Sequence, residues 1–463
     1  ITSQLTHLTV ISNHRELNSP LIYSSDQHTH THTRMASPKG GVSLSWRAYG
    51  DTDIGGSREN QDDMFIFDRP ALGICVLGVL DGHGRDVGQT ASETGRKFLL
   101  SYFEEHVDEL LEDPYTCLVQ GIVQSHEAIR ESFIRVLRGK GWEVQNTAEE
   151  YLVKRKSSSH PWACVHGGTS CSLVALVNTT LYTANVGDSS GILCSSRAIL
   201  AQSMVKHVGD SAIGNKRHPN MSTDDTPVST VVLTAEHSPE SPEEFIRMRN
   251  FRHREGDPTQ PSLLVVYDAS THDKSRCSPV FSLDANGDPV VTNRGSYYKN
   301  VRHEWASLVA APSYARFQDA LAFTRSIGDF HLHLYGVTHY PEVTSIDLKP
   351  IFESLEESNE DLSSQPYLAV VLASDGIWDN WEYDDVTSFV VNPELRSKAK
   401  RIESKIDESS STDEEDGLKY TKHISKALID ANAVHANRNF GNQADNATGI
   451  VMIIQPCTSG SRK

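Results

Sequence analysis

The sequence lacks the features that mark secreted, membrane-spanning and nucleic-acid-binding proteins. Its seven cysteines are scattered and form no Cys-x-x-Cys pair, which disfavours a disulfide framework or zinc site and favours a reducing compartment. The longest apolar runs, 73–80 and 367–373, are far too short to cross a bilayer. Positive charge is scarce, because 43 Lys and Arg stand against 61 Asp and Glu, for a net charge of −18. We therefore expect no membrane and no nucleic-acid partner.

The composition indicates one large domain that carries insertions and tails. Hydrophobic residues make up 38% of the 463, which is enough for a core. The first 44 residues are rich in Ser, Thr and His and poor in acids, so we expect a disordered or processed tail there. The domain is expected over 45–455, with a C-terminal tail at 456–463. Insertions are expected at about 139–163, 196–228, 252–315 and 395–417. We expect a monomer in the cytoplasm or nucleus, and targeting of an organelle by the N-terminal segment stays open.

Hydrophobic periodicity predicts strands and helices in separate blocks. The predicted strands are 43–49, 64–67, 74–80, 169–177, 180–185, 367–373 and 447–454. The predicted helices are 86–104, 116–138 and 418–437, the last through Ile424, Leu428, Ala431 and Val434. Residues 139–163 and 353–360 are predicted to be loops. The two-residue link at 178–179 implies antiparallel pairing of its strands. Without regular strand–helix alternation, the pattern favours an α+β layered fold over a doubly wound sheet.

Acidic residues recur where apolar strands meet glycine turns. The candidate positions are Asp62, Asp63, Asp81, Asp188, Asp375, Asp379 and Asp445. A single Asp-Gly is most simply a turn. Several carboxylates at the rim of one core would repel one another and stay ionised only if a cation joined them. Oxygen ligands suit Mg²⁺ and Mn²⁺, so the sequence predicts a site for these ions. Gly82, Gly187 and Gly376 are expected to relieve the backbone beside these carboxylates.

Two further side chains complete this set. His83 stands two residues after Asp81 and is suited to proton transfer near neutral pH. Arg58 precedes the acidic pair 62–63, and its guanidinium is suited to bidentate capture of phosphate. Each residue alone would read as an ordinary surface residue. Together with the carboxylates they favour phosphoryl chemistry.

Eight motifs in family order resemble those of the metal-dependent protein phosphatases, the type 2C serine/threonine family. They extend over roughly 45–455 and are Arg58–Asp63, Val79–Gly84, Gly167–Ser170, Ala184–Ser189, Leu233–Pro239, Leu321–Asp329, Ala373–Asp379 and Asp445–Thr448. The resemblance implies a four-layer sandwich in which two antiparallel β-sheets are flanked by α-helices. It also implies hydrolysis of phosphoserine and phosphothreonine in phosphorylated protein substrates. The ions implied are two Mg²⁺ or Mn²⁺, with a weaker third.

The resemblance also implies a role for each site residue. Asp81 would bridge both ions, and Gly82 would contribute its carbonyl oxygen. Asp62 would bind one of the two ions, and Asp375 and Asp445 would bind the other. Asp188 and Asp379 would bind the weaker third ion together with Asp375, and Asp63 would act through a water molecule. Arg58 would bind the phosphate. A hydroxide bridging the two ions would attack phosphorus while His83 protonates the departing serine or threonine oxygen. The family usually has Glu where Asp62 stands, so one metal is expected to bind less tightly.

Other readings explain fewer of these residues. The segment 187–191 superficially resembles a serine-protease loop, but it lacks Gly at 190 and leaves the aspartates unexplained. The segment 284–288 resembles the start of a calcium loop, yet Pro289 stands where glycine is required. His28, His30 and His32 are more simply part of a solvated tail. The serious alternative is a catalytically silent relative, a scaffold or regulatory binding module that keeps the fold without turnover.

Overall fold

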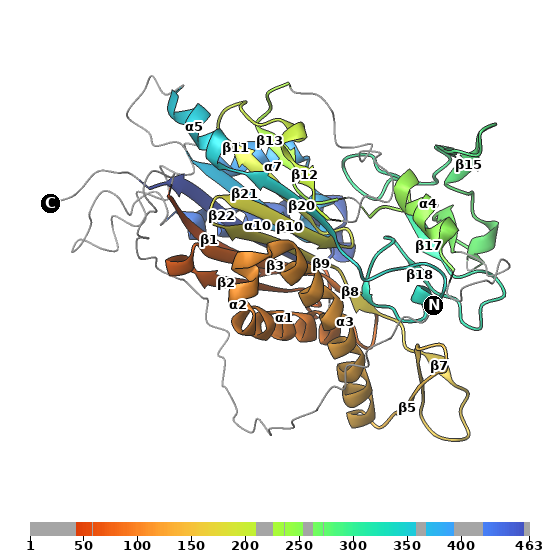
Figure 1. Ribbon diagram of the computed structural model, residues 1–463. Helices are drawn as coiled ribbons and strands as arrows, with labels where there is room; N and C mark the ends of the chain where they lie inside the picture. The colour runs from red at the N-terminus through yellow and green to blue at the C-terminus, as the bar shows by residue number, and fades with distance from the viewer. Residues whose placement is uncertain are drawn as a thin grey trace, which may run out of the picture.

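Two antiparallel sheets stacked face to face form the centre of the molecule in the computed structural model (Figure 1). The structure describes residues 43–57, 59–209, 226–235, 237–252, 263–271, 273–357, 367–392 and 420–457. The predicted insertion at 395–417 and nearly all of both predicted tails lie outside these residues. Among the described residues, no helix has the length and apolar character that a membrane span requires.

The larger sheet has six strands and the smaller has five. The six-stranded sheet has the order β12 (Lys206–His207), β20 (Glu342–Asp347), β10 (Thr180–Val186), β9 (Cys171–Val177), β3 (Ile74–Leu80) and β2 (Asp63–Arg69). The five-stranded sheet has the order β1 (Leu44–Asp53), β22 (Ala447–Pro456), β21 (Leu368–Ala373), β11 (Ser190–Ser195) and β13 (Thr230–Val232). Neighbouring strands in both sheets pair antiparallel. Three short strands, β4 (Gly82–His83), β8 (Gly168–Thr169) and β19 (Ile327–Gly328), form a small sheet of their own.

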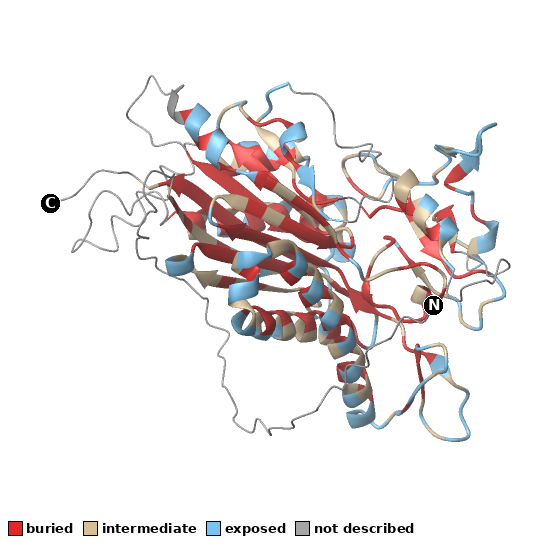
Figure 2. Cartoon of the chain, in the orientation of Figure 1, coloured by how far each residue is buried: buried red, intermediate tan, exposed pale blue. Residues whose placement is uncertain are grey.

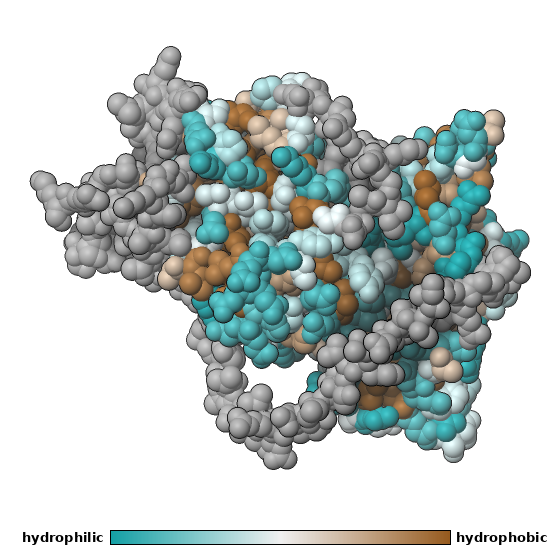
Figure 3. Space-filling model, viewed as in Figure 1, coloured by the Kyte–Doolittle hydropathy of each residue, from teal (hydrophilic) through white to brown (hydrophobic). Residues whose placement is uncertain are grey.

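Helices cover the outer face of each sheet. The six-stranded sheet packs against α1 (Gly88–Glu105) and α3 (Pro114–Gly139), with the short α2 (Val107–Glu112) between them. The five-stranded sheet packs against α7 (Tyr383–Val390) and α10 (Thr421–Asn439). Apolar side chains fill all three interfaces, including the one between the sheets, which contains Leu77, Val174 and Met452. Figure 2 shows the buried strands, and Figure 3 shows a mainly hydrophilic outer surface over α1. The predicted α+β four-layer sandwich is therefore confirmed.

The end of the sandwich carries additional elements from the middle of the chain. Helix α4 (Pro242–Asn250) packs beside a three-stranded sheet of β14 (Leu264–Tyr267), β17 (Ser307–Ala310) and β18 (Ala320–Leu321), and a hairpin joins β15 (Phe281–Leu283) to β16 (Pro289–Val291). This lobe, which we define as the described residues between 242 and 323, lies beside one end of the sheets (Figure 1). It has its own apolar cluster, around Tyr267, Val280 and Val309.

Two predicted loops contain regular structure, and one residue of a predicted helical face, Val434, is wrong. The segment 139–163 contains β5 (Glu143–Asn146) and β6 (Leu152–Arg155), which pair with each other, and β7 (Ala163–Cys164) pairs with β6. The acidic segment after 353 continues α5 (Lys349–Glu357), which is anchored by Ile351 and Phe352. In α10, Val434 is 68% exposed, and Ile429 is buried instead. The tight turn at 178–179 forms as predicted, and the strands on its two sides, β9 and β10, pair antiparallel with each other.

Candidate metal centre

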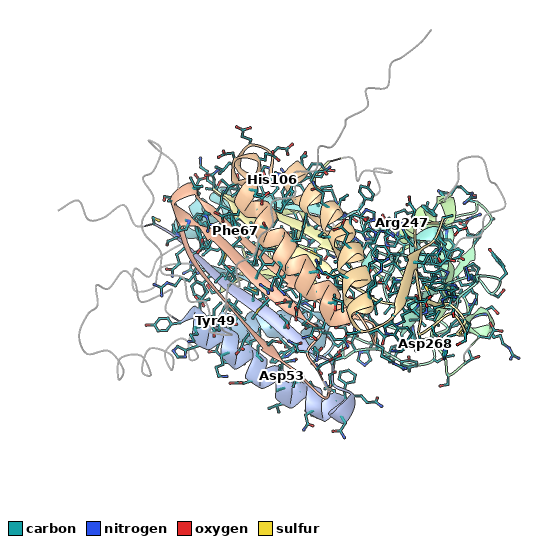
Figure 4. All side chains as sticks on the ribbon, turned by 90° about the horizontal axis from the view of Figure 1, so that it is seen from below. Tyr49, Asp53, Phe67, His106, Arg247 and Asp268 are labelled. Atoms are coloured by element: carbon teal, nitrogen blue, oxygen red, sulfur yellow. The ribbon has the colours of Figure 1, made fainter. Side chains whose placement is uncertain are left out.

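The acidic loops meet at one end of the sandwich because the sheet register places strand ends side by side. Asp81 follows β3 directly, and Asp63 at the start of β2 pairs with Leu80. Asp188 lies between β10 and β11, and Asp375 begins α6 (Asp375–Trp378) just after β21. Asp445 stands two residues before β22. In Figure 4, β1 runs from Tyr49 to Asp53, and its Asp53 end, which pairs with Ala447, is the end nearer the lobe that carries Arg247 and Asp268.

Three carboxylates form the centre of this cluster. One oxygen each from Asp81, Asp188 and Asp375 lies within 4.8 Å of the other two. Asp81 and Asp188 are tied together by two serines, because the Ser170 hydroxyl accepts from the Asp81 backbone N–H at 3.1 Å and lies 2.8 Å from the Ser189 hydroxyl. These contacts fix two loops that are more than 100 residues apart in the sequence.

Asp62 and Asp379 lie at the edges of the trio. The Ser374 hydroxyl donates to Asp62 Oδ2 at 2.9 Å, and Asp62 is only 7% exposed. The Asp379 backbone N–H donates to the carbonyl of Asp375 at 2.7 Å, across the short helix α6. Asp445 is exposed and accepts from the Asn446 backbone N–H at 2.8 Å. The structure thus gathers six of the seven predicted acidic residues into one neighbourhood.

Burial and mutual repulsion raise the pKa values of these carboxyl groups. Burial raises the pKa of Asp62 to about 7, and the charges of Asp375 and Asp445 add to it. Burial likewise raises the pKa of Asp375 to about 6, and the charge of Asp188 contributes. Although Asp445 is exposed as a residue, surrounding protein atoms partly desolvate its carboxyl group, and this desolvation together with the charge of Asp375 raises its pKa to about 6. The pKa of Asp81 is raised well above its usual range by burial and then by the charges of Asp62 and Asp375. Such a cluster is unfavourable by itself and favours a bound cation.

Unpartnered oxygen atoms show that this cluster fits divalent metal ions. Within the part of the chain that the structure describes, Asp62 Oδ1, Asp188 Oδ1 and Asp375 Oδ1 are buried and have no hydrogen-bond partner. Buried carboxylate oxygens without partners are costly unless they coordinate a cation. The donors are all oxygen atoms, which suits Mg²⁺ or Mn²⁺ better than softer metals.

Asp63 lies apart from the cluster. Its Oδ2 accepts from Arg96 Nε at 2.7 Å, and its Oδ1 accepts from the Met64 backbone N–H at 2.9 Å. Burial raises the pKa of Asp63, although the charge of Arg96 opposes this. Asp63 therefore anchors the start of β2 to α1, and Arg58, the predicted phosphate-binding residue, falls outside the described residues.

The three glycines beside the carboxylates are required for different reasons. Gly187 has a positive φ of 105°, which side chains with a Cβ rarely adopt. A Cβ at Gly376 would lie 1.9 Å from the Asn446 carbonyl oxygen, and one at Gly82 would lie 2.4 Å from the Gln61 carbonyl oxygen. Gly82 and Gly376 thus allow backbones to approach closely, while Gly187 permits the turn itself.

His83 forms a close pair with a carboxylate that the sequence analysis did not single out. His83 Nε2 lies 2.6 Å from Asp329 Oδ2, and the Ser326 hydroxyl donates to the same oxygen at 2.6 Å. Burial alone would lower the pKa of His83, but the charge and hydrogen bond of Asp329 outweigh it and raise the pKa. Asp329 is 2% exposed and adopts a positive φ of 41°, so its backbone is strained at this turn. The only sequence signal for Asp329 was its place at the end of the motif at 321–329.

A second cluster of potential ligands, His126, His333 and His339, lies behind that turn. One ring nitrogen from each lies within 4.8 Å of the others. The rings of His126 and His339 stack at 4.0 Å with an angle of 12°, so their nitrogen lone pairs run nearly parallel instead of converging on one ion. His126 Nδ1 already accepts from the Gly328 backbone N–H at 3.2 Å. Burial lowers the pKa of His333 to about 3 and of His339 to about 4, so these neutral rings support the turn that presents Asp329.

Comparison with known proteins identifies the family. The family model described as protein phosphatase 2C matches residues 97–254 and 307–418, which is more than half of the chain. Among solved structures, a serine-threonine phosphatase 2C from Toxoplasma gondii is 16% identical, with a TM-score of 0.47 over 90% of this chain and 98% of that chain. A sex determining protein from C. elegans is also 16% identical, with a TM-score of 0.43 over 90% of this chain and 66% of that chain. No curated protein matches the sequence. On the strength of the family model, the chain belongs to the protein phosphatase 2C family.

Proposed function

We propose that this protein is a metal-dependent serine/threonine phosphatase that hydrolyses phosphoserine and phosphothreonine in proteins with two Mg²⁺ or Mn²⁺ ions. Membership of the family supports the coarser statement that it is a protein phosphatase. The observation that carries the finer proposal is the convergence of Asp81, Asp188 and Asp375 at the same end of the sandwich as His83. Among the described residues, buried oxygens of Asp62, Asp188 and Asp375 at this site lack hydrogen-bond partners.

The proposed ion positions are those that the family resemblance implies, and the clustering of the carboxylates supports them. Asp81 is central, and its carboxylate is the one that we assign to both ions. Asp62 and the carbonyl oxygen of Gly82 would hold one ion, and Asp375 with Asp445 the other. Asp188 and Asp379 would take a weaker third ion beside Asp375. When bound, the ions supply a water activated for attack on phosphorus and neutralise charge on the phosphate.

The remaining steps belong to side chains of the chain itself. His83 would donate a proton to the departing serine or threonine oxygen, which is a poor leaving group without one. Asp329 would keep His83 protonated and fix its ring, since one ring nitrogen is held at 2.6 Å and the other stays available as a donor. Arg58 would bind the phosphate oxygens through its guanidinium. Asp63 has the indirect role of anchoring the loop that carries Asp62.

Substrates and organisation follow from the same proposal. The substrates would be phosphorylated proteins, acted on by a monomer in which residues 45–455 form one phosphatase domain. The location in the cytoplasm or nucleus stays a prediction. Residues 139–163 and the lobe at 242–323 frame the end of the sandwich that carries the carboxylates, so they are placed to affect which proteins bind (Figure 1).

Metal-dependent turnover tests the proposal directly. We expect the purified full chain to hydrolyse a phosphothreonine peptide in Mn²⁺ or Mg²⁺, and we expect a chelator to abolish the reaction. Asp375→Asn should reduce turnover by about 100-fold or more, because it removes a charged ligand from the centre of the cluster. Phosphate release measured against metal concentration reads out both effects.

A matched variant separates loss of the site from loss of the fold. Asp284→Asn changes a carboxylate that only caps a surface turn in the lobe, where it accepts from the backbone N–H groups of Asn286 and Asp288, and it should leave turnover unchanged. If the wild-type protein binds metal but releases no phosphate from any phosphopeptide, the alternative of a catalytically silent scaffold replaces the proposal.

A further inference from the structure

A hairpin in the lobe reaches the carboxylate cluster and carries a lysine to it. The hairpin extends from Tyr298 to Trp305, whose rings stack at 4.1 Å and whose backbones form an isolated bridge. The Lys299 backbone N–H donates to the Glu304 carbonyl at 2.8 Å. Asn300, near the tip, is buried, and its side chain both donates to Glu304 Oε2 at 2.7 Å and accepts from the Glu304 N–H at 3.2 Å. The hairpin is therefore a well-fixed unit.

The tip of this hairpin docks directly on the segment that bears Asp379. The Val301 backbone N–H donates to the Asp379 carbonyl at 3.1 Å. The Arg302 guanidinium donates to the carbonyl oxygens of Trp378 and Trp381, the latter at 3.2 Å. The lobe is thus bonded to Asp379 and to residues on both sides of it, and Lys299 stands two residues before Val301 on the same hairpin.

The charge of Lys299 acts on three of the clustered carboxylates. Burial raises the pKa values of Asp188, Asp375 and Asp379, and in each case Lys299 opposes that rise. Arg302 also opposes the rise at Asp379. Lys299 Nζ also lies 3.5 Å from Glu304 Oε2, and its side chain is 27% exposed, so this contact holds the ammonium group without burying it completely.

The charges at the site do not balance with two divalent ions alone. Asp62, Asp81, Asp188, Asp375, Asp379 and Asp445 carry six negative charges when ionised, whereas two divalent ions supply four positive ones. Uncompensated charge in a partly buried cluster is costly. Lys299 is held by Glu304 on the hairpin that docks at Asp379, so its charge can supply part of the missing compensation at Asp188 and Asp379 without occupying a coordination position.

We propose that Lys299 is a positioning residue that acts as a fixed cation for the Asp188–Asp379 side of the cluster and thereby limits how many divalent ions the cluster holds. This inference rests on the proposed function, because it concerns the same ions. Lys299 lies between the two ranges that the family model matches, 97–254 and 307–418, so the inference concerns this chain's own lobe.

Metal titration of the full chain tests this role without relying on activity. Metal-stripped protein is titrated with Mn²⁺ by calorimetry for the wild type, Lys299→Met and Lys299→Arg. We expect Lys299→Met to bind one additional Mn²⁺ or to bind Mn²⁺ about 10-fold more tightly, since a unit charge at close range changes affinity by a decade or more. Lys299→Arg keeps the charge and should titrate like the wild type.

The matched control is Lys274→Met, which removes another partly exposed lysine of the same lobe. Lys274 pairs with Asp268 at 2.6 Å and has no part in the carboxylate cluster, so the Mn²⁺ titration of Lys274→Met should equal that of the wild type.

Identical Mn²⁺ isotherms for the wild type and Lys299→Met would overturn the inference, and a rise in peptide KM alone would assign Lys299 to substrate binding instead. If the wild type binds Mn²⁺ but releases no phosphate, the proposed function fails while the titration still decides the role of Lys299. If neither protein binds Mn²⁺, both proposals fail.

Discussion

The pairing of His83 with Asp329 explains why the pKa of a partly buried histidine is raised. Burial disfavours the charged imidazolium, yet Asp329 is itself buried and ionised, and its charge keeps the His83 pKa raised. The same interaction lowers the pKa of Asp329, where burial alone would raise it. The two shifts have the same origin, namely that each charged group stabilises the other. A protonated His83 at neutral pH is the state that a proton donor requires.

Replacing His83 should affect substrates according to their leaving group. His83→Gln removes the proton donor, so we expect turnover of a phosphothreonine peptide to fall by about 100-fold, within the range of general acid catalysis. An aryl phosphate should lose much less, because its leaving oxygen needs little protonation. Steady-state kinetics on both substrates measure the difference.

The control for this variant is a histidine far from the cluster. His106 stands at the junction of α1 and α2, where its Nδ1 lies 2.8 Å from the Tyr102 carbonyl oxygen, and Figure 4 shows it well away from Asp53 and Asp268. His106→Gln should leave both activities unchanged. An equal loss on the two substrates for His83→Gln would rule out a proton donor and point to a role in binding.

At the scale of elements, the sequence predicted strands and helices whose burial is uniform or periodic. The strand at 74–80 was predicted with its observed bounds, because all seven residues are apolar or glycine and all are buried. The hairpin of β5 and β6 was missed because Glu143, Gln145 and Asn146 in β5 are exposed and polar. Helix α5 was missed in part because its acidic outer face hid the buried Leu355.

A residue of the site could likewise be predicted only where the local sequence pattern marks its position. The aspartates could be found because all of them except Asp379, which follows α6, lie beside an apolar strand, and the sheet register then brings them together. Asp329 and Lys299 could not be found in this way, since their neighbours in space, His83 and Asp379, are 246 and 80 residues away in sequence. Contacts between segments so far apart in the sequence leave no local pattern.

The start of α6 depends on a glycine that lets two loops touch. A Cβ at Gly376 would meet the Asn446 carbonyl oxygen at 1.9 Å, so Gly376→Ala must push the Asp375 and Asp445 loops apart. We expect a loss of about 1–3 kcal/mol in the free energy of unfolding, as for other overpacked sites. Mn²⁺ affinity should also fall by about 10-fold or more, because two proposed ligands move. Denaturant unfolding and Mn²⁺ calorimetry measure these effects.

Gly139→Ala provides the opposite case. Gly139 ends α3, and a Cβ there would meet nothing within 4 Å, so alanine should leave Mn²⁺ affinity unchanged and stabilise the helix by about 0.5–1 kcal/mol. Unchanged Mn²⁺ affinity in Gly376→Ala would show that the close approach of the two loops does not set the geometry of the site.

For the whole molecule, the carboxylate cluster couples stability to pH and metal. The pKa of Asp62 is raised to about 7 in the folded protein by burial, above the ordinary aspartate value of 3.8, so the folded state binds more protons than the unfolded state between these two pH values. Its contribution to stability therefore falls as the pH rises from about 4 to about 7. Glu342 acts in the opposite sense. Burial alone would raise its pKa, but the hydrogen bonds with His207 and His237 outweigh burial and lower it. The contribution of Glu342 to the stability of the folded state is therefore present above its unfolded pKa and is lost as the pH falls. A variant of one clustered carboxylate is therefore needed to separate the effect of the cluster on the pH dependence of stability from the effect of groups such as Glu342.

Asp62→Asn provides that variant, because it removes one buried carboxyl group of strongly raised pKa. In chelator at about pH 8, we expect its free energy of unfolding to exceed that of the wild type by roughly 2–4 kcal/mol, with the difference vanishing near pH 4. Saturating Mn²⁺ should reverse the order, since the wild type gains a ligand interaction that the amide cannot match. Asp113→Asn, at an exposed helix cap whose hydrogen bonds with Thr116 lower its pKa, should instead be slightly less stable than the wild type at about pH 8. If the metal-free Asp62→Asn protein melts at or below the wild-type temperature at that pH, then repulsion among these carboxylates is not what the metal relieves.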